Sequence, residues 1–173
     1  MTDFKSDHWF GDIRSHLIKN MPKDSEFLEK FKTAQFQESD QTKYILDKLE
    51  IETYNTANEG IKVRNRFSVH IEHIAPKTMS NVNDWQGFAK LDDETRKEYI
   101  TSIGNLTLLE KRPNIKASNN PFDEKKQFYT EKNTSMRMTQ DLLKYDEWGV
   151  DAIERRSGKL AEKALKIWHF DEK

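Results

Sequence analysis

The segment that most limits the fold of this chain is FSVHIEHIAP, residues 67–76. Hydrophobic and polar residues alternate through residues 67–74, and several are β-branched, a pattern typical of a β-strand. In a regular strand His70 and Glu72 lie on one face and His73 on the other. Glu72 and His73 can therefore serve one site only if the strand ends or bends near His73. Pro76 favours such an end, because proline disrupts regular strand pairing.

Helical patterns surround this segment, apart from a second short strand predicted in NLTLLE, residues 105–110. Apolar residues recur at helical spacing, and Asp40 and Asn120 are the expected N-caps of two helices. The expected helices lie within residues 1–22 and over residues 22–36, 39–54, 91–102, 120–132 and 149–170. The order predicts an α+β fold that is mostly helical. We expect residues 1–60 to form an N-terminal helical segment that packs on a nuclease core of residues 61–173, as one structural unit.

Length and composition narrow the class of protein. A chain of 173 residues suits one domain with a real core, and 11% aromatic residues argue against disorder. It contains no cysteine, which excludes disulfides, cysteine-bound zinc and thiol catalysis, and which fits a reducing cytoplasm. We see no signal peptide and no apolar stretch long enough to span a membrane. We therefore expect a cytoplasmic protein.

The cluster His70, Glu72 and His73 is the strongest chemical signal, although a single histidine on a strand is usually structural. A carboxylate beside an imidazole offers an oxygen ligand for a divalent cation and a base that titrates near neutral pH. These are the groups that metal-assisted hydrolysis requires. The spacing differs from HExxH, so a zinc metalloprotease is not indicated.

Two asparagines and a basic segment lie further along the chain. Asn105 follows Gly104, where a carboxamide can bond to neighbouring backbone and fix a loop, and the Asn114 side-chain oxygen is a ligand type that Mg²⁺ accepts. Each could equally be a turn residue. Residues 110–137 hold seven basic and four acidic residues, a local charge of +3 in a chain of net charge −1. This suits a phosphate backbone, although a solvated helix face is the usual explanation.

The motifs HIEHIAP, GNLTLL and SNNPFDEKKQFY, in this order, resemble the C-terminal domain of GmrSD-type modification-dependent restriction endonucleases. The resemblance implies a nuclease domain of the HNH, or His-Me finger, type, with a ββα-metal core embedded in a helical domain. It implies that His73 is the general base and Glu72 the adjacent metal ligand. It assigns Asn105 to pinning the finger loop and Asn114 to a second metal position. It leaves His70 a supporting role.

The expected function is metal-dependent cleavage of duplex DNA in restriction and anti-phage defence, with Mg²⁺ as the ion and Mn²⁺ or a similar ion as a substitute. The rival interpretation is a catalytically weak module that binds DNA or a partner within a larger restriction protein. The family also implies a ParB-like domain or partner subunit, of which residues 1–60 show no sign. Expected backbone contacts are Arg112, Lys116, Lys125 and Lys126, and the alternative path follows Arg155, Arg156 and Lys159. We also expect Asn105→Asp to lose activity with little loss of stability.

Overall fold

The structure is a computed structural model that describes residues 9–57 and 69–169. Its helices are α1 (Trp9–Asn20), α2 (Asp24–Thr33), α3 (Asp40–Thr56), α4 (Asp93–Thr101), α5 (Lys111–Ala117), α6 (Phe122–Lys126), α7 (Arg137–Gln140) and α8 (Val150–Trp168). Short 3-10 turns are η2 (Val82–Asp84), η3 (Phe88–Lys90), η4 (Ile103–Asn105) and η5 (Asp141–Lys144), and the strands are β1 (Val69–His73) and β2 (Leu106–Glu110). The expectation of a mostly helical α+β fold is confirmed.

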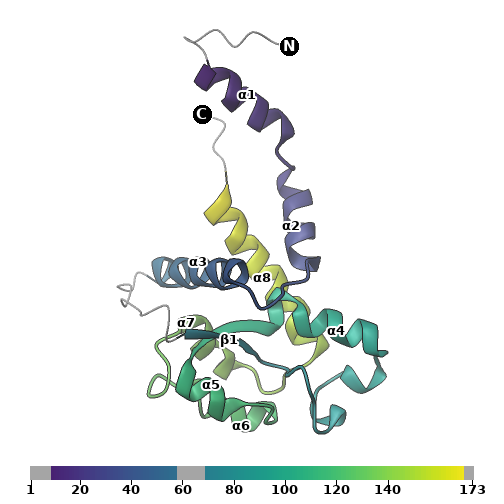
Figure 1. Ribbon diagram of the computed structural model, residues 1–173. Helices are drawn as coiled ribbons and strands as arrows, with labels where there is room; N and C mark the ends of the chain where they lie inside the picture. Colours follow the sequence, from purple (N-terminus) through teal and green to yellow (C-terminus); the bar gives the residue numbers. More distant parts are fainter. Residues whose placement is uncertain (1–8, 58–68, 170–173) are drawn as a thin grey trace.

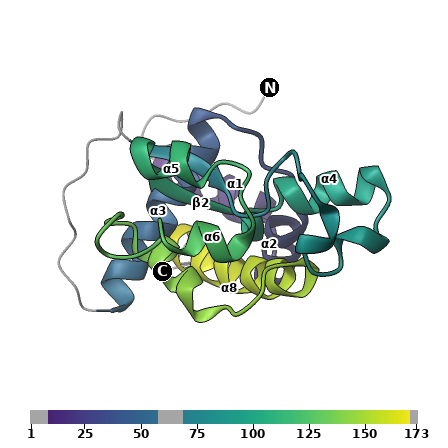
Figure 2. The same ribbon diagram turned by 90° about the horizontal axis from the view of Figure 1, so that it is seen from below.

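The two strands form an antiparallel sheet in which His73 pairs with Leu106 and Glu72 pairs with Thr107. Strand β1 ends at His73, as Pro76 predicted. Helices α3 and α8 lie on one side of this sheet, and α5 and α6 lie on the other (Figures 1 and 2). The predicted strand residues Phe67 and Ser68 lie outside the described residues.

Helix α8 supports the sheet at the 3-10 turn that directly precedes β2. It packs against α2, α3 and η4 (Figure 1). The approach to η4 is so close that a Cβ at Gly104 would overlap the carbonyl oxygen of Ile153 and the hydroxyl of Ser157. That hydroxyl accepts a hydrogen bond from Gly104 N at 3.1 Å. Arg156 donates from Nη1 to Gly104 O and Leu106 O, so α8 fixes the backbone on both sides of Asn105.

Apolar clusters lie on both sides of β2, which explains why its residues are almost all buried. Leu106 and Leu108 pack with Leu46 and Leu49 of α3 in one cluster, whereas Leu109 belongs to the other. The second cluster includes Ile74, Trp85, Phe88, Phe122, Tyr129, Trp148 and Ile153. The sheet is therefore held between two apolar clusters, and burial of apolar surface on this scale is the main source of folding free energy.

Several helix predictions need correction in detail. Ser39, not Asp40, caps α3, and its hydroxyl accepts a hydrogen bond from Thr42 N at 3.1 Å. Helix α6 is much shorter than the predicted 120–132, and Pro121 stands at its N-cap in place of Asn120.

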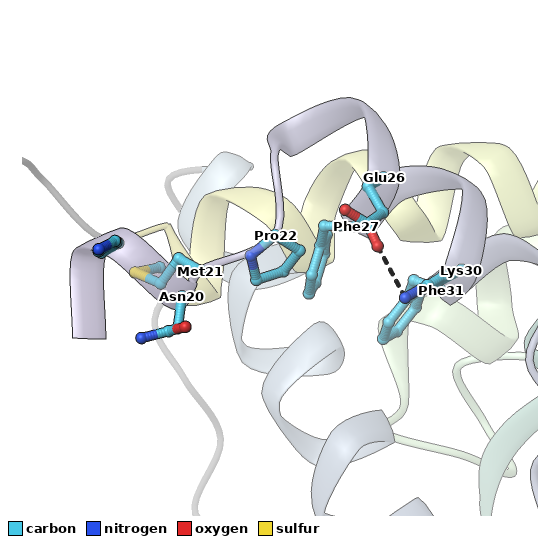
Figure 3. A pocket seen from close by; sticks show the side chains of 8 residues that line it. Asn20, Met21, Pro22, Glu26, Phe27, Lys30 and Phe31 are labelled. Carbon is cyan, nitrogen blue, oxygen red and sulfur yellow. Dashed lines mark ion pairs between the residues drawn. The ribbon is translucent and has the colours of Figure 1, made fainter. Parts of the chain in front are cut away.

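The N-terminal helices extend away from the sheet. Helix α1 continues beyond α2 as an arm (Figure 1). A pocket lies where the two helices meet (Figure 3). Phe27 and Phe31 line it, and Glu26 pairs with Lys30 at its rim at 2.7 Å. None of its lining residues comes from either strand. Among the described helices, none is long and apolar enough to cross a membrane.

Candidate active site

Glu72 lies at the centre of a buried polar cluster at the end of β1. Its carboxylate Oε1 accepts hydrogen bonds from Lys125 Nζ at 2.8 Å and from the Tyr129 hydroxyl at 2.9 Å. Oε2 accepts one from Asn114 Nδ2 at 3.2 Å. Burial raises the pKa of Glu72, and the attraction of Lys125 opposes that rise. A carboxylate with three donors around it is satisfied in its charged form.

His73 follows Glu72 directly and is also nearly buried. Its Nδ1 lies 3.5 Å from Glu38 Oε1, and the other oxygen of Glu38 pairs with Lys77 Nζ at 3.0 Å. Burial, helped by the positive charge of Lys77, lowers the pKa of His73 to about 4. The imidazole is therefore neutral at pH 7 and has a nitrogen that can accept a proton.

Asn105 fixes the loop that follows His73. Its side chain is completely buried, and Oδ1 accepts hydrogen bonds from Ala75 N at 2.8 Å and from Trp148 Nε1 at 3.1 Å. Nδ2 donates to Ala75 O at 2.8 Å and to Ile100 O at 3.0 Å. Its backbone carbonyl accepts a further hydrogen bond from Ile74 N. One side chain thus joins the chain after β1 to the chain before β2.

Asn114 lies on α5, the helix that follows β2, and its side chain faces Glu72. The oxygen and nitrogen of an asparagine amide exchange places by a half-turn, so Asn114 can offer an oxygen beside Glu72 Oε2. Mg²⁺ commonly takes one or two protein oxygens and keeps several waters. These two side chains therefore fit a hard divalent cation. The described residues contain no group of three or more histidine, cysteine or acidic side chains that could hold a metal.

The other predicted residues lie in three different environments. His70 is exposed on β1 and stands outside the buried cluster. Arg112 and Lys116 are exposed on α5, as a phosphate contact would require. Lys126 pairs with Asp123 at 3.0 Å and donates to the carbonyl of Asp146.

Lys125 is buried and cannot reach DNA in this conformation. The structure therefore corrects the expectation that this lysine contacts the DNA backbone. Its side chain has no solvent exposure, and its ammonium bonds to Glu72 and to His73 O. Phe122, Lys125 and Tyr129 recur at helical spacing in the sequence, which indicates a shared buried face. That spacing could have suggested a buried face, but it does not identify Glu72 as the partner of Lys125 and Tyr129. Glu38 comes from the distant connection between α2 and α3, and no sequence signal links it to His73.

No curated protein matches the chain. The family described as GmrSD restriction endonucleases, C-terminal domain, matches residues 21–163, which include every element from α2 through most of α8. The matched range contains the whole of the cluster around Glu72, His73, Asn105 and Asn114. On this match, the chain belongs to the family of GmrSD restriction endonuclease C-terminal domains.

Proposed function

We propose that this restriction endonuclease domain is an HNH-type nuclease that hydrolyses phosphodiester bonds of DNA with a divalent cation, Mg²⁺ in the first instance. The observation that carries the proposal is the contact between Glu72, at the end of β1 next to His73, and Asn114 of the helix that follows β2. This is the ββα order that the family resemblance implies. Asn105, which directly precedes β2, holds the loop that follows His73.

In this mechanism His73 takes a proton from the attacking water. Its neutral state at pH 7 leaves it able to do so, and Glu38 beside Nδ1 stabilises the imidazolium that forms. Glu72 Oε2 and Asn114 would hold the cation. A bound Mg²⁺ would supply positive charge to the scissile phosphate and the leaving oxygen. Asn105 keeps His73 in place by fixing the backbone of Ala75 two residues later.

The DNA backbone is expected along α5. Arg112 and Lys116 are exposed on the helix that carries Asn114, so they can reach phosphates near the cluster. Phosphate contacts of this kind position the duplex without reading its sequence. Recognition of modified bases is assigned to a ParB-like domain or partner, in keeping with a role in anti-phage defence.

One observation favours the alternative, a module that binds DNA without cutting it. Lys125 already places a positive charge on Glu72, 2.8 Å from Oε1. That charge opposes the approach of a cation to the same carboxylate. Cleavage therefore requires that an ion bind Oε2 in spite of Lys125.

A supercoiled-plasmid assay tests the proposal. Plasmids with and without modified bases are incubated with Mg²⁺, with Mn²⁺ or with excess EDTA. We expect nicked or linear products only with a metal ion, and a loss of about 10²–10⁴-fold for His73→Ala. His16→Ala is the matched control, because His16 is exposed on α1 outside the matched range. Full cleavage in EDTA, or by His73→Ala, would refute the mechanism. Binding of DNA without any cleavage would support the binding module.

A further inference from the structure

Lys125 is a buried charge to which the mechanism above gives no task. Its side chain is fully buried, and its ammonium reaches two consecutive residues of the finger. Nζ lies 2.8 Å from Glu72 Oε1 and 2.7 Å from His73 O. Burying an ammonium costs several kcal/mol unless hydrogen bonds and an opposite charge compensate. Both are present here, so the lysine is held in one geometry.

We propose that Lys125 is a positioning residue that, together with Tyr129, fixes which oxygen of Glu72 is offered to the cation. This inference rests on the proposed function. Lys125 and Tyr129 both donate hydrogen bonds to Oε1, and this oxygen is therefore already occupied. Within residues 9–57 and 69–169, Oε2 has only the longer contact to Asn114, at 3.2 Å. Glu72 is thereby presented as a ligand through one oxygen, on the side of α5.

The same ammonium also holds the backbone that leads away from His73. Lys125 binds the carbonyl of His73, while Asn105 binds Ile74 N through its backbone and both polar backbone atoms of Ala75 through its side chain. The three residues after Glu72 are therefore held by α6 on one side and by η4 on the other. A shift of Lys125 would move both the proposed ligand and the proposed base.

A purely structural ion pair predicts something different. If Lys125 only stabilised the fold, its loss would lower stability but leave the cation affinity and the cleavage rate of the folded protein close to wild type. If Lys125 positions Glu72 while its positive charge repels the cation, its loss should change cation affinity and cleavage rate in opposite directions. A cation would bind at least as tightly, because a nearby positive charge has gone. Cleavage would be slower, because Glu72 could rotate and offer either oxygen.

The test compares Lys125→Met with two controls. Lys97→Met removes an exposed lysine from α4, and Leu46→Ala destabilises the core next to α3 without touching the cluster. Mn²⁺ binding is measured by calorimetry without DNA, cleavage by single-turnover kinetics at saturating Mn²⁺, and stability by urea unfolding. For Lys125→Met we expect Mn²⁺ binding about fivefold tighter and cleavage about 100-fold slower. For Leu46→Ala we expect lower stability, with binding and the single-turnover rate close to wild type.

Weaker Mn²⁺ binding by Lys125→Met, or an unchanged cleavage rate, would overturn the inference. If Lys125→Met does not fold, Tyr129→Phe takes its place, since it removes the other donor to Oε1. Its expected result is a cleavage rate about threefold lower with Mn²⁺ affinity retained, and an unchanged rate would again count against positioning. If the wild type cleaves nothing, the proposed function fails, while the Mn²⁺ measurements still decide whether Lys125 opposes a cation at Glu72.

Discussion

Replacing Asn105 is the most sensitive test of how the chain that follows β1 is held in place. Its side chain makes four hydrogen bonds, two as acceptor and two as donor, and all of them are buried. Asn105→Ala would leave the Ala75 amide and carbonyl, the Ile100 carbonyl and the Trp148 indole without their partner. Each of these groups lies in the interior, where water cannot replace the lost contact.

The expected loss of stability follows from the free energy needed to leave buried polar groups without hydrogen bonds. Each costs about 1–3 kcal/mol, and a relaxing loop recovers part of the total. We therefore expect Asn105→Ala to lower the free energy of unfolding by about 3–5 kcal/mol. A domain of this size has about 5–15 kcal/mol in all, so the variant should fold but with little margin.

Asn105→Asp is expected to be worse at neutral pH, which reverses the expectation of a small loss of stability drawn from the sequence. In the native protein, Ala75 O and Ile100 O accept hydrogen bonds from Asn105 Nδ2. In the variant, a carboxyl oxygen replaces this nitrogen and faces the same two carbonyls. Burial and these carbonyls would raise the pKa of the introduced carboxyl above its unfolded value of about 3.9. The folded form then binds a proton more tightly than the unfolded form. The variant should recover stability as the pH falls and lose it as the pH rises.

Urea unfolding followed by circular dichroism at pH 5 and pH 7.5 measures both effects. Asn133→Ala is the control, because its amide also donates two hydrogen bonds but lies on the surface. We expect it to lose about 1 kcal/mol or less. The reasoning would be refuted if Asn105→Ala lost no more than this control. It would also be refuted if Asn105→Asp were equally stable at both pH values.

Three further predictions concern protons, metal and salt. Burial lowers the pKa of His73 to about 4 in the folded state, against about 6.5 in the unfolded state. The free energy of unfolding should therefore fall by about 3 kcal/mol as the pH falls from 6.5 to 4. His73→Asn should remove this part of the pH dependence in urea titrations. Addition of EDTA should leave the melting temperature unchanged, because two apolar clusters hold the fold, and a drop of several degrees would show a structural ion. Replacing Arg112 and Lys116 together by alanine should lower the log–log salt slope of DNA binding by about two in metal-free anisotropy titrations, whereas the same change at Arg155 and Lys159 should not. The reverse result would place the DNA along α8.

The sequence was sufficient to predict the parts of the site that depend on local pattern. Alternation located β1, and Pro76 indicated its end at His73, which is where the strand stops. The position of Asn105 beside Gly104 suggested a loop-fixing amide, and the side chain does bond to the backbone of Ala75. These predictions succeed because each depends on a few neighbouring residues.

The parts that failed depend on contacts between distant segments. Lys125 reads as a surface lysine in a run of charges, but the carboxylate that stabilises it inside the protein lies 53 residues earlier. Glu38 reaches His73 from a connection between helices. Helix α5 was not predicted, and Pro113 lies inside it, in the first turn, where proline is tolerated.

The cluster around Glu72 is better explained by function than by stability. A buried ion pair adds little to stability compared with well-packed apolar side chains, because removing both charges from water costs as much as their attraction returns. The neighbouring core contains Phe122, Trp148 and Ile153, so an apolar pair at Glu72 and Lys125 would pack with residues already present. The chain instead holds a carboxylate, an ammonium and a phenol together in the interior. That cost is offset by the two apolar clusters on either side of the sheet, and what it secures is a carboxylate oxygen in a fixed place next to His73.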